Sequence, residues 1–298
     1  MINKTAMIAI VGRANAGKST LTNRLTGDKV AIVSPKPQTT RNRIFGVFTH
    51  KDTQMILLDT PGFHKAKTRL GDYMVGVIKE SVADVDAVAL IVEPVDNIGT
   101  QEELLIEHIK KSGVSAVLVI NKIDTVKPDL ILPIIERYSE YYNFDAIVPI
   151  SAKKGSGVSE LLEVLEGYSK PGPQLFPDDM STDQPERQII AEIIREKLLI
   201  CLDKEIPHGT AVEITKFSER GDEDNAIIDV DATIYCEKSS HKGMIIGKQG
   251  AMLKKIGQYA REDIERFMGA KVFLQTWVKV KENWRDSKMM MKNFGYTK

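Results

Sequence analysis

The feature that most constrains this chain is a short glycine-containing segment near its start. It follows an apolar, strand-like run over Met7–Val11 and precedes a run with helical spacing over Ser19–Thr26. A loop of this pattern between a strand and a helix turns backbone amides inward and places phosphate at a helix N-terminus. The sequence therefore predicts an α/β unit with a phosphate-binding loop, Gly12-Arg13-Ala14-Asn15-Ala16-Gly17-Lys18-Ser19.

Individual residues of this loop suit separate parts of a nucleotide. Gly12 and Gly17 allow the amides to approach phosphate oxygens, Lys18 brings a positive charge to the β- and γ-phosphates, and the Ser19 hydroxyl can bind Mg²⁺. The predicted nucleotide contacts continue through Thr20. A glycine-rich turn that happens to precede a helix is the alternative.

A second motif, Asn121-Lys122-Ile123-Asp124, directly follows the apolar run Val114–Ile120. Ligands of open α/β sheets bind at the carboxyl ends of the strands, so Asp124 is placed at that edge. A carboxylate accepts two hydrogen bonds, as the N1–H and amino group of guanine require. The motif predicts selection of guanine through Asn121, Lys122 and Asp124, although the same residues in isolation would be an exposed turn.

Two further segments follow predicted strands. Asp59-Thr60-Pro61-Gly62 follows Met55–Leu58; Asp59 is placed to hold Mg²⁺ and Gly62 to offer its amide to the γ-phosphate. Many nucleotide-hydrolysing proteins with this motif carry a glutamine directly after the glycine, where it orients the attacking water. In this sequence that position is Phe63. After Ala146–Ile150 comes a weaker signal, Ser151-Ala152-Lys153, which would support the base of the nucleotide through its backbone.

The order of elements predicts two domains. Strand-like and helical runs alternate to about Tyr168, which indicates a mostly parallel sheet with helices on both faces. Prolines and acidic residues then indicate a linker. We predict domains at residues 1–172 and 187–298, joined by a linker over 173–186.

The second half predicts a smaller α+β domain in the order helix, strand, strand, helix, helix, strand. Its runs are a helix over Gln188–Ile206 and strands over Thr210–Phe217, Ala226–Cys236 and Lys271–Lys281, with two short helices around Gly247–Gly250 and a last helix in the tail. Trp277 and Trp284 are expected to pack in the core or dock a helix rather than stack on bases, and Cys201 and Cys236 to be reduced packing residues.

The charge of the chain is strongly uneven. Residues 173–237 contain 6 basic and 16 acidic side chains, whereas residues 238–298 contain 14 basic and 5 acidic ones, so a formal net charge of zero hides a basic end. This end carries Met244-Ile245-Ile246-Gly247-Lys248-Gln249-Gly250, whose glycines let amides approach phosphates. Predicted RNA contacts are Ile245, Ile246, Gly247, Lys248, Gln249, Gly250 and Lys254, and a simple helix–helix turn is the alternative.

The residues from Ile8 to about Tyr168 resemble the translation-factor-related GTPases. Within that class Gln38-Thr39-Thr40-Arg41 resembles the first switch, where a threonine closes on Mg²⁺; Thr40 is preferred and Thr39 remains open. With Phe63 after the Asp-Thr-Pro-Gly segment and a C-terminal type II KH pattern, the whole chain resembles the Era family of bacterial GTPases. Ala14 departs from the proline that many members carry.

The resemblance implies a GTPase that binds GTP or GDP with Mg²⁺ and acts in ribosome biogenesis. Lys18, Thr40, Gly62 and Asn15 would serve hydrolysis, with Ser19, Thr40 and Asp59 on Mg²⁺ and K⁺ held near Asn15. Hydrolysis would be slow, because a phenyl ring at position 63 cannot orient water.

The implied partners are the 3′ end of 16S rRNA and the 30S subunit. The implied protein is a cytoplasmic monomer that can associate peripherally with the inner face of the cell membrane, and no run of the sequence is long and apolar enough for an integral segment. The alternative functions are a membrane-associated signalling GTPase linking growth or cell cycle to translation, a small-molecule kinase, and a passive RNA-binding module.

Overall fold

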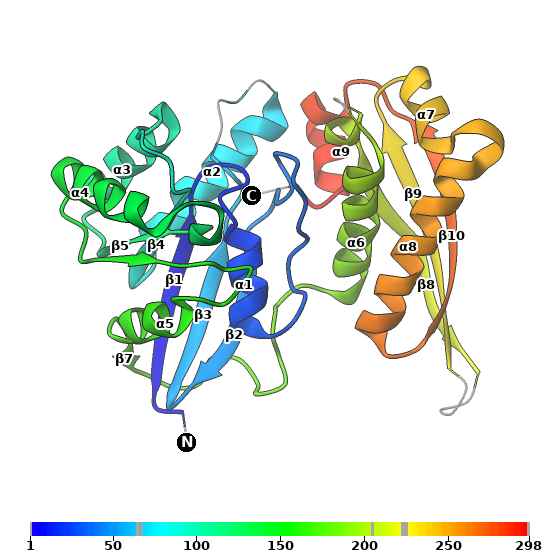
Figure 1. Cartoon of the computed structure of the whole chain (residues 1–298). Helices are drawn as coiled ribbons and strands as arrows, with labels where there is room; N and C mark the ends of the chain where they lie inside the picture. Colours follow the sequence, from blue (N-terminus) through cyan, green and yellow to red (C-terminus); the bar gives the residue numbers. More distant parts are fainter. Residues whose placement is uncertain (1, 64–65, 67, 204–205, 222–225, 297–298) are drawn as a thin grey trace. The chain divides into compact units, whose positions relative to one another are not determined.

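The structure is a computed structural model that describes residues 2–63, 66, 68–203, 206–221 and 226–296. Its internal packing divides the chain into two compact units, each with its own sheet and core (Figure 1). The first comprises Met1–Ala31, Thr40–Lys67 and Gly71–Asp183, and the second comprises Ile32–Thr39, Thr68–Leu70 and Gln184–Lys298. The domain boundaries at residues 172 and 187 stay predictions.

The first sheet is mixed but mostly parallel. Its strand order is β2-β3-β1-β4-β5-β6, with only β2 and the short β7 antiparallel to their neighbours. The strands are β1 (Lys4–Val11), β2 (Ile44–His50), β3 (Thr53–Asp59), β4 (Ala87–Val92), β5 (Ala116–Ile120), β6 (Ala146–Pro149) and β7 (Lys170–Pro171). The helices are α1 (Lys18–Thr26), α2 (Arg69–Ala83), α3 (Thr100–Ser112), α4 (Ile131–Tyr141) and α5 (Val158–Glu166).

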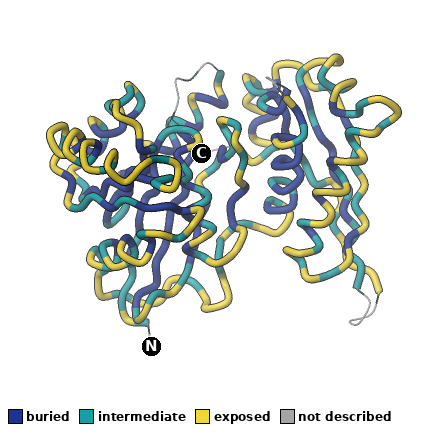
Figure 2. Tube along the Cα trace, in the orientation of Figure 1, coloured by how far each residue is buried: buried dark blue, intermediate teal, exposed yellow. Residues whose placement is uncertain are grey.

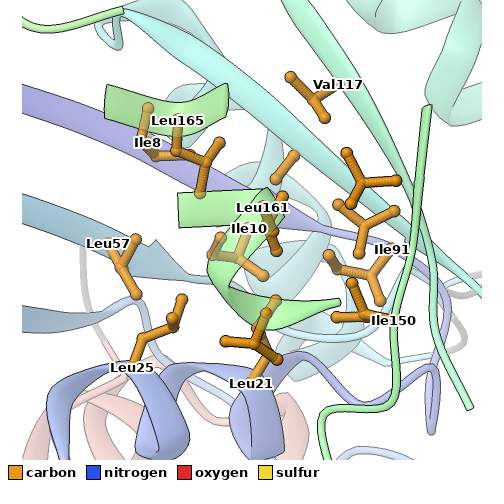
Figure 3. Packing of buried hydrophobic residues seen from close by; sticks show 14 of the residues in the cluster. Ile8, Ile10, Leu21, Leu25, Leu57, Ile91, Val117, Ile150, Leu161 and Leu165 are labelled. Carbon is orange, nitrogen blue, oxygen red and sulfur yellow. The ribbon is translucent and has the colours of Figure 1, made fainter. Parts of the chain in front are cut away.

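Helices cover both faces of this sheet, because successive strand residues point to opposite sides. Ile8 and Ile10 of β1 pack with Leu21 of α1 and Leu161 of α5 (Figure 3). The intervening Ala9 and Val11 belong to a second cluster, with side chains of α2, α3 and α4. The strands β3, β4 and β5 are accordingly buried along their whole length (Figure 2). The predicted α/β architecture of the first half is confirmed.

The segment predicted as a linker is irregular in its backbone, yet much of it is hydrogen-bonded to the first unit. The Gln54 side chain accepts hydrogen bonds from the amides of Leu175 and Phe176 at 2.8 and 3.0 Å, and donates to the Phe176 carbonyl at 2.7 Å. The Val47 amide donates to Ser181 O at 2.8 Å. Prolines prevent regular structure here without preventing attachment.

The second unit has the predicted order of elements. It consists of α6 (Glu186–Cys201), β8 (Ala211–Arg220), β9 (Ile227–Cys236), α7 (Ser239–Ile246), α8 (Ala251–Met268) and β10 (Lys271–Val280), followed by α9 (Lys288–Asn293). Its sheet order is β10-β9-β8, with β8 antiparallel and β10 parallel to β9. The helix predicted to reach Ile206 ends at Cys201, and Lys204 and Glu205 lie outside the described residues.

The core of the second unit lies between one face of this sheet and α6, α7 and α8. Trp284 is fully buried and donates from Nε1 to Gly209 O at 2.9 Å, as expected for a core residue. Trp277 is different: it lies on β10 and its side chain is 44% exposed, so its predicted core role is wrong. Cys201 and Cys236 are free, and only Cys236 is fully buried.

Among the helices that the structure describes, none combines the length and apolar character that crossing a bilayer requires.

Candidate nucleotide-binding site

The predicted nucleotide residues meet at one edge of the first sheet. In the strand order β3-β1-β4-β5-β6, parallel strands end side by side, so the loops that follow β3, β1, β5 and β6 are neighbours. Asp59 is the last residue of β3, and the loops after β1, β5 and β6 contain the phosphate-loop motif, Asn121–Asp124 and Ser151. The sheet thus brings together four segments that are far apart in the sequence.

The phosphate loop is held in a conformation that requires glycine at Gly17. Its φ is +98°, and a Cβ there would lie 2.1 Å from Asn121 Nδ2. That amide instead donates to Ala16 O at 2.8 Å. Because α1 begins at Lys18, its unpaired N-terminal amides face this loop.

Lys18 is almost fully buried within the loop. Its ammonium donates to Gly12 O at 3.0 Å and to Arg13 O at 2.8 Å. Burial lowers the pKa of Lys18 from 10.5 to about 8, against the opposing charge of Asp59. A phosphate beside this group would favour its charged form.

Three oxygen-bearing side chains converge beside Lys18. Ser19 Oγ donates to Asp59 Oδ2 at 2.6 Å and lies 2.8 Å from Thr40 Oγ1. Asp59 is fully buried, and its Oδ1 has no hydrogen-bond partner among the described residues. Burial raises the pKa of Asp59 to about 6, although Lys18 and Ser19 favour the ionised form.

This donor set fits Mg²⁺, which binds hydroxyl and carboxylate oxygens and retains several waters. The buried and unpartnered Asp59 oxygen is the observation that supports the fit. Thr39, the other switch threonine, is engaged elsewhere: its hydroxyl donates to Lys36 O at 2.6 Å and lies 2.8 Å from Ser34 Oγ. The geometry therefore favours Thr40.

The segment after Asp59 packs closely against the phosphate loop. Thr60 donates from its hydroxyl to Ile10 O at 2.8 Å, so its role here is to tie the segment to β1. A Cβ on Gly62 would lie 2.6 Å from Ala14 Cα, which leaves room for no larger residue. The Phe63 amide donates to Gly12 O at 3.1 Å, and its ring packs against the second core cluster.

The segment Asn121–Asp124, predicted to bind guanine and called the base loop below, is fixed by side chains at both of its ends. Asn121 Oδ1 accepts from the Ala152 amide at 2.9 Å, so this buried residue links the phosphate loop to Ser151–Lys153. Ser151 Oγ donates to Asp124 Oδ1 at 2.6 Å. This hydrogen bond holds the pKa of Asp124 below its usual range and keeps the carboxylate ionised as an acceptor. Ser151 thus acts through its side chain, beyond the predicted backbone support.

Two residues that contact these loops were not predicted from the sequence. Arg24 of α1 donates to the carbonyls of Ala152 and Lys153, the latter at 2.7 Å. Glu93, the residue after β4, forms ion pairs with Arg13 and Lys122. The rule that located Asp124 just beyond a strand end would also have identified Glu93.

The Gly-x-x-Gly segment of the second unit connects α7 to α8. Gly247 and Gly250 have φ of +73° and +81°, and Gln249 between them has φ of +52°. Lys248 and Gln249 are exposed, whereas Ile245 is fully buried in the core. The prediction that Ile245 offers a surface to bases is therefore wrong, because its side chain anchors α7.

A pocket of about 490 Å³ lies beside this segment, between α8 and β10. The exposed side chains of Lys254, Gln258 and Arg261 line it at the spacing of one helix face. The other lining residues are Gly250, Leu253, Gly257, Leu274 and Thr276.

Comparisons with known proteins agree with this description of both units. A family model described as 50S ribosome-binding GTPase matches residues 7–122, and a KH domain model matches residues 205–285. GTPase Era of Ruminiclostridium cellulolyticum is 52% identical over 296 residues, which are 99% of this chain and 98% of that protein. GTPase Era of Clostridioides difficile is 49% identical and covers 98% of both chains.

Two solved structures match along essentially the full length. Era in complex with MgGDPNP and nucleotides 1506–1542 of 16S ribosomal RNA aligns with a TM-score of 0.94 and 37% identity, covering 100% of both chains. A tyrosine-to-alanine variant of Aquifex aeolicus Era bound to GDP·AlF4⁻ aligns with a TM-score of 0.94 and 38% identity, covering 99% of this chain and 100% of that one. The chain belongs to the Era family and is a GTPase with a C-terminal KH domain.

Proposed function

We propose that this protein is a GTP-dependent switch that binds the 3′ end of 16S rRNA and acts in the maturation of the small ribosomal subunit. The observation that carries the proposal is the match over both full chains to an Era structure holding MgGDPNP and 16S rRNA nucleotides. We further propose that the protein is a cytoplasmic monomer that docks on the 30S subunit. Peripheral association with the cell membrane stays a prediction from the resemblance.

In the nucleotide half, the loop from Gly12 to Thr20 would hold the phosphates and Asp124 would read guanine. Ser19, Thr40 and Asp59 would hold Mg²⁺, whose charge offsets that of the phosphates. The short distances among these three side chains support the assignment. Gly62 would present its amide to the γ-phosphate, because its segment already packs on Ala14.

For hydrolysis, the aromatic residue Phe63 supplies no group that orients water. We propose that the intrinsic rate is slow and that K⁺ raises it, with Asn15 helping to hold the ion. The ion would stabilise charge that develops on the transferring phosphoryl group. Asn15 lies within the phosphate loop, which is the position this role requires.

In the second unit, RNA would run along the Gly-x-x-Gly segment and the adjoining pocket. Lys248 and the exposed face of Lys254, Gln258 and Arg261 offer cations and hydrogen-bond donors to phosphates and base edges. Residues 238–298 carry 14 basic and 5 acidic side chains, so the electrostatic potential there favours RNA.

The test replaces two exposed residues of the Gly-x-x-Gly segment, Lys248→Asp with Gln249→Asp. Aspartate tolerates the left-handed backbone of Gln249, so the fold should persist while the new charges repel phosphate. We expect the dissociation constant for RNA of the sequence 1506–1542 to rise at least about tenfold, roughly 1.4 kcal/mol. Fluorescence anisotropy at fixed salt measures it.

The matched control is Lys288→Asp with Asn283→Asp. It introduces the same charge change at exposed positions of the same basic end, and Asn283 is also left-handed, with φ of +52°. Equal losses in the two double variants would mean a general electrostatic effect, and unchanged binding by the first would refute the assigned RNA site.

A further inference from the structure

Glu93 occupies a distinctive position in the first unit. In the sheet order, β4 lies between β1 and β5, so the residue after its end lies between the phosphate loop and the base loop. The Asn121 amide donates to Val92 O at 2.8 Å, which brings the end of β4 against the start of the base loop. Glu93 follows Val92 directly.

Each carboxylate oxygen of Glu93 holds a cation from a different loop. Oε2 accepts from the Arg13 guanidinium at 2.5 Å, and Oε1 accepts from the Lys122 ammonium. Arg13 belongs to the phosphate loop and Lys122 to the base loop. One side chain therefore joins the two loops that would grip opposite ends of a nucleotide.

The bridge continues into α3 on the side of the phosphate loop. Arg13 Nε lies 3.3 Å from Glu102 Oε1, and the Glu102 side chain is 4% exposed. Because a guanidinium can serve two carboxylates at fixed angles, Arg13 is held between Glu93 and Glu102. The Glu93 side chain is 21% exposed, so solvent and salt screen these pairs less than pairs on the open surface.

The electrostatics of the bridge agree with its geometry. Burial alone would raise the pKa of Glu93, but the hydrogen bond and charge of Lys122, with those of Arg13, hold it below its ordinary value. The carboxylate is therefore ionised near neutral pH and both pairs are charged.

We propose that Glu93 is a positioning residue that sets the distance and register between the phosphate-binding loop and the guanine-binding loop. The inference rests on the proposed assignment of these loops to a guanine nucleotide. Glu93 acts through Arg13 and Lys122 and needs no contact with the nucleotide itself. A ligand that spans both loops gains affinity when they are held in the bound arrangement beforehand.

The substitution Glu93→Gln tests this role with little change of shape. The amide is neutral, and its NH₂ group cannot accept from a cation, so Glu93→Gln removes the charge of both ion pairs and leaves one oxygen in place of two. We expect the dissociation constant for GDP to rise about tenfold. We also expect weaker discrimination against IDP, which lacks the amino group that Asp124 would bind, because the base loop is no longer fixed relative to the phosphates.

A double-mutant cycle separates positioning from general weakening of the fold. Lys122→Met removes the charge and keeps an apolar stem, and its cost in GDP affinity should be smaller in the Glu93→Gln protein than in the wild type. Glu107→Gln, at an exposed position of α3, is the matched control and should bind like the wild type. Thermal unfolding of each variant without nucleotide checks the fold.

Isothermal titration with GDP and IDP on the full chain decides the outcome. Wild-type affinity in Glu93→Gln, or fully additive costs in the cycle, would overturn the inference. If Glu93→Gln does not fold, Arg13→Met cuts the same bridge from its other end and should give the same tenfold loss. A wild-type chain that does not bind GDP would instead refute the proposed function.

Discussion

At Asn15, the contribution of the side chain must be distinguished from that of the backbone conformation. Its φ is +66°, in the left-handed region that asparagine tolerates better than most residues. The asparagine could therefore serve the turn, the proposed K⁺ ion, or both. Glycine adopts this conformation without strain, so Asn15→Gly removes the side chain and keeps the turn.

We expect GTP turnover by the wild type to be faster in KCl than in NaCl at equal ionic strength. Asn15→Gly should lose this stimulation while retaining GDP affinity and its rate in NaCl, because the proposed ion ligand is removed and the left-handed turn is kept. Phosphate release under single-turnover conditions measures both rates. Equal wild-type rates in the two salts would remove K⁺ from the account.

At the residue scale, the position of a site residue could be predicted best where its motif directly follows a strand. Asp124 and Asn121 lie at the sheet edge as expected, because a strand end fixes the position of the next few residues. Ile245 was misjudged, because its neighbours in sequence do not reveal which face of α7 the core covers. The position of Glu93 after a strand could have been noticed, but its two partners could not be predicted, because they lie 80 and 29 residues away in the sequence.

At the scale of elements, α5 depends on the sheet rather than on its own propensity. It has 9 residues, too few for an isolated helix to be stable in water. Leu161 is fully buried and packs with Ile8 and Ile10 in the first core cluster (Figure 3). The helix in turn follows the loop that carries Ser151.

We therefore expect Leu161→Ala to lower the free energy of unfolding by about 2–5 kcal/mol, through lost burial and a residual cavity. Glu163→Ala, at an exposed position on the same helix, should change it by less than about 0.5 kcal/mol. Chemical denaturation followed by far-UV circular dichroism compares the two. Equal effects would mean that α5 is not held by this cluster.

Three elements of the first unit were absent from the sequence prediction: β2, α2 and the two-residue β7. The strand β2 lies at the edge of the sheet, next to β3, and only some of its residues are buried. It also contains Gly46, which has no side chain to pack. Its sequence therefore lacks the regular apolar pattern by which strands are predicted. The helix α2 contains Gly71 and Gly76, which weaken its intrinsic helical preference. Tertiary packing supplies what the local sequence lacks: Ile78 and Val82 are buried in the second core cluster.

At the scale of the whole molecule, the two units have separate hydrophobic cores and differ in their charge and in the motifs they carry. The apolar cluster of the second unit shares no residue with the two large clusters that cover the faces of the first sheet. The first unit carries the phosphate loop, Asp59, Thr40 and the base loop, whereas the second carries the Gly-x-x-Gly segment and the basic end, together with Gln38 and Thr39 of the predicted first switch. Sequence revealed this division because alternation, charge and motif type all change between the halves. A switch requires that the state of one unit alter binding by the other.

The most direct test is the affinity of the full chain for 16S nucleotides 1506–1542 with GDPNP and Mg²⁺, with GDP and Mg²⁺, and without nucleotide. We predict binding at least about tenfold tighter with GDPNP than with GDP, a coupling of roughly 1.4 kcal/mol. Lys18→Ala, which removes the phosphate-binding charge, should abolish the difference. Equal RNA affinity in all three states, at concentrations where nucleotide binding is saturated, would contradict the account.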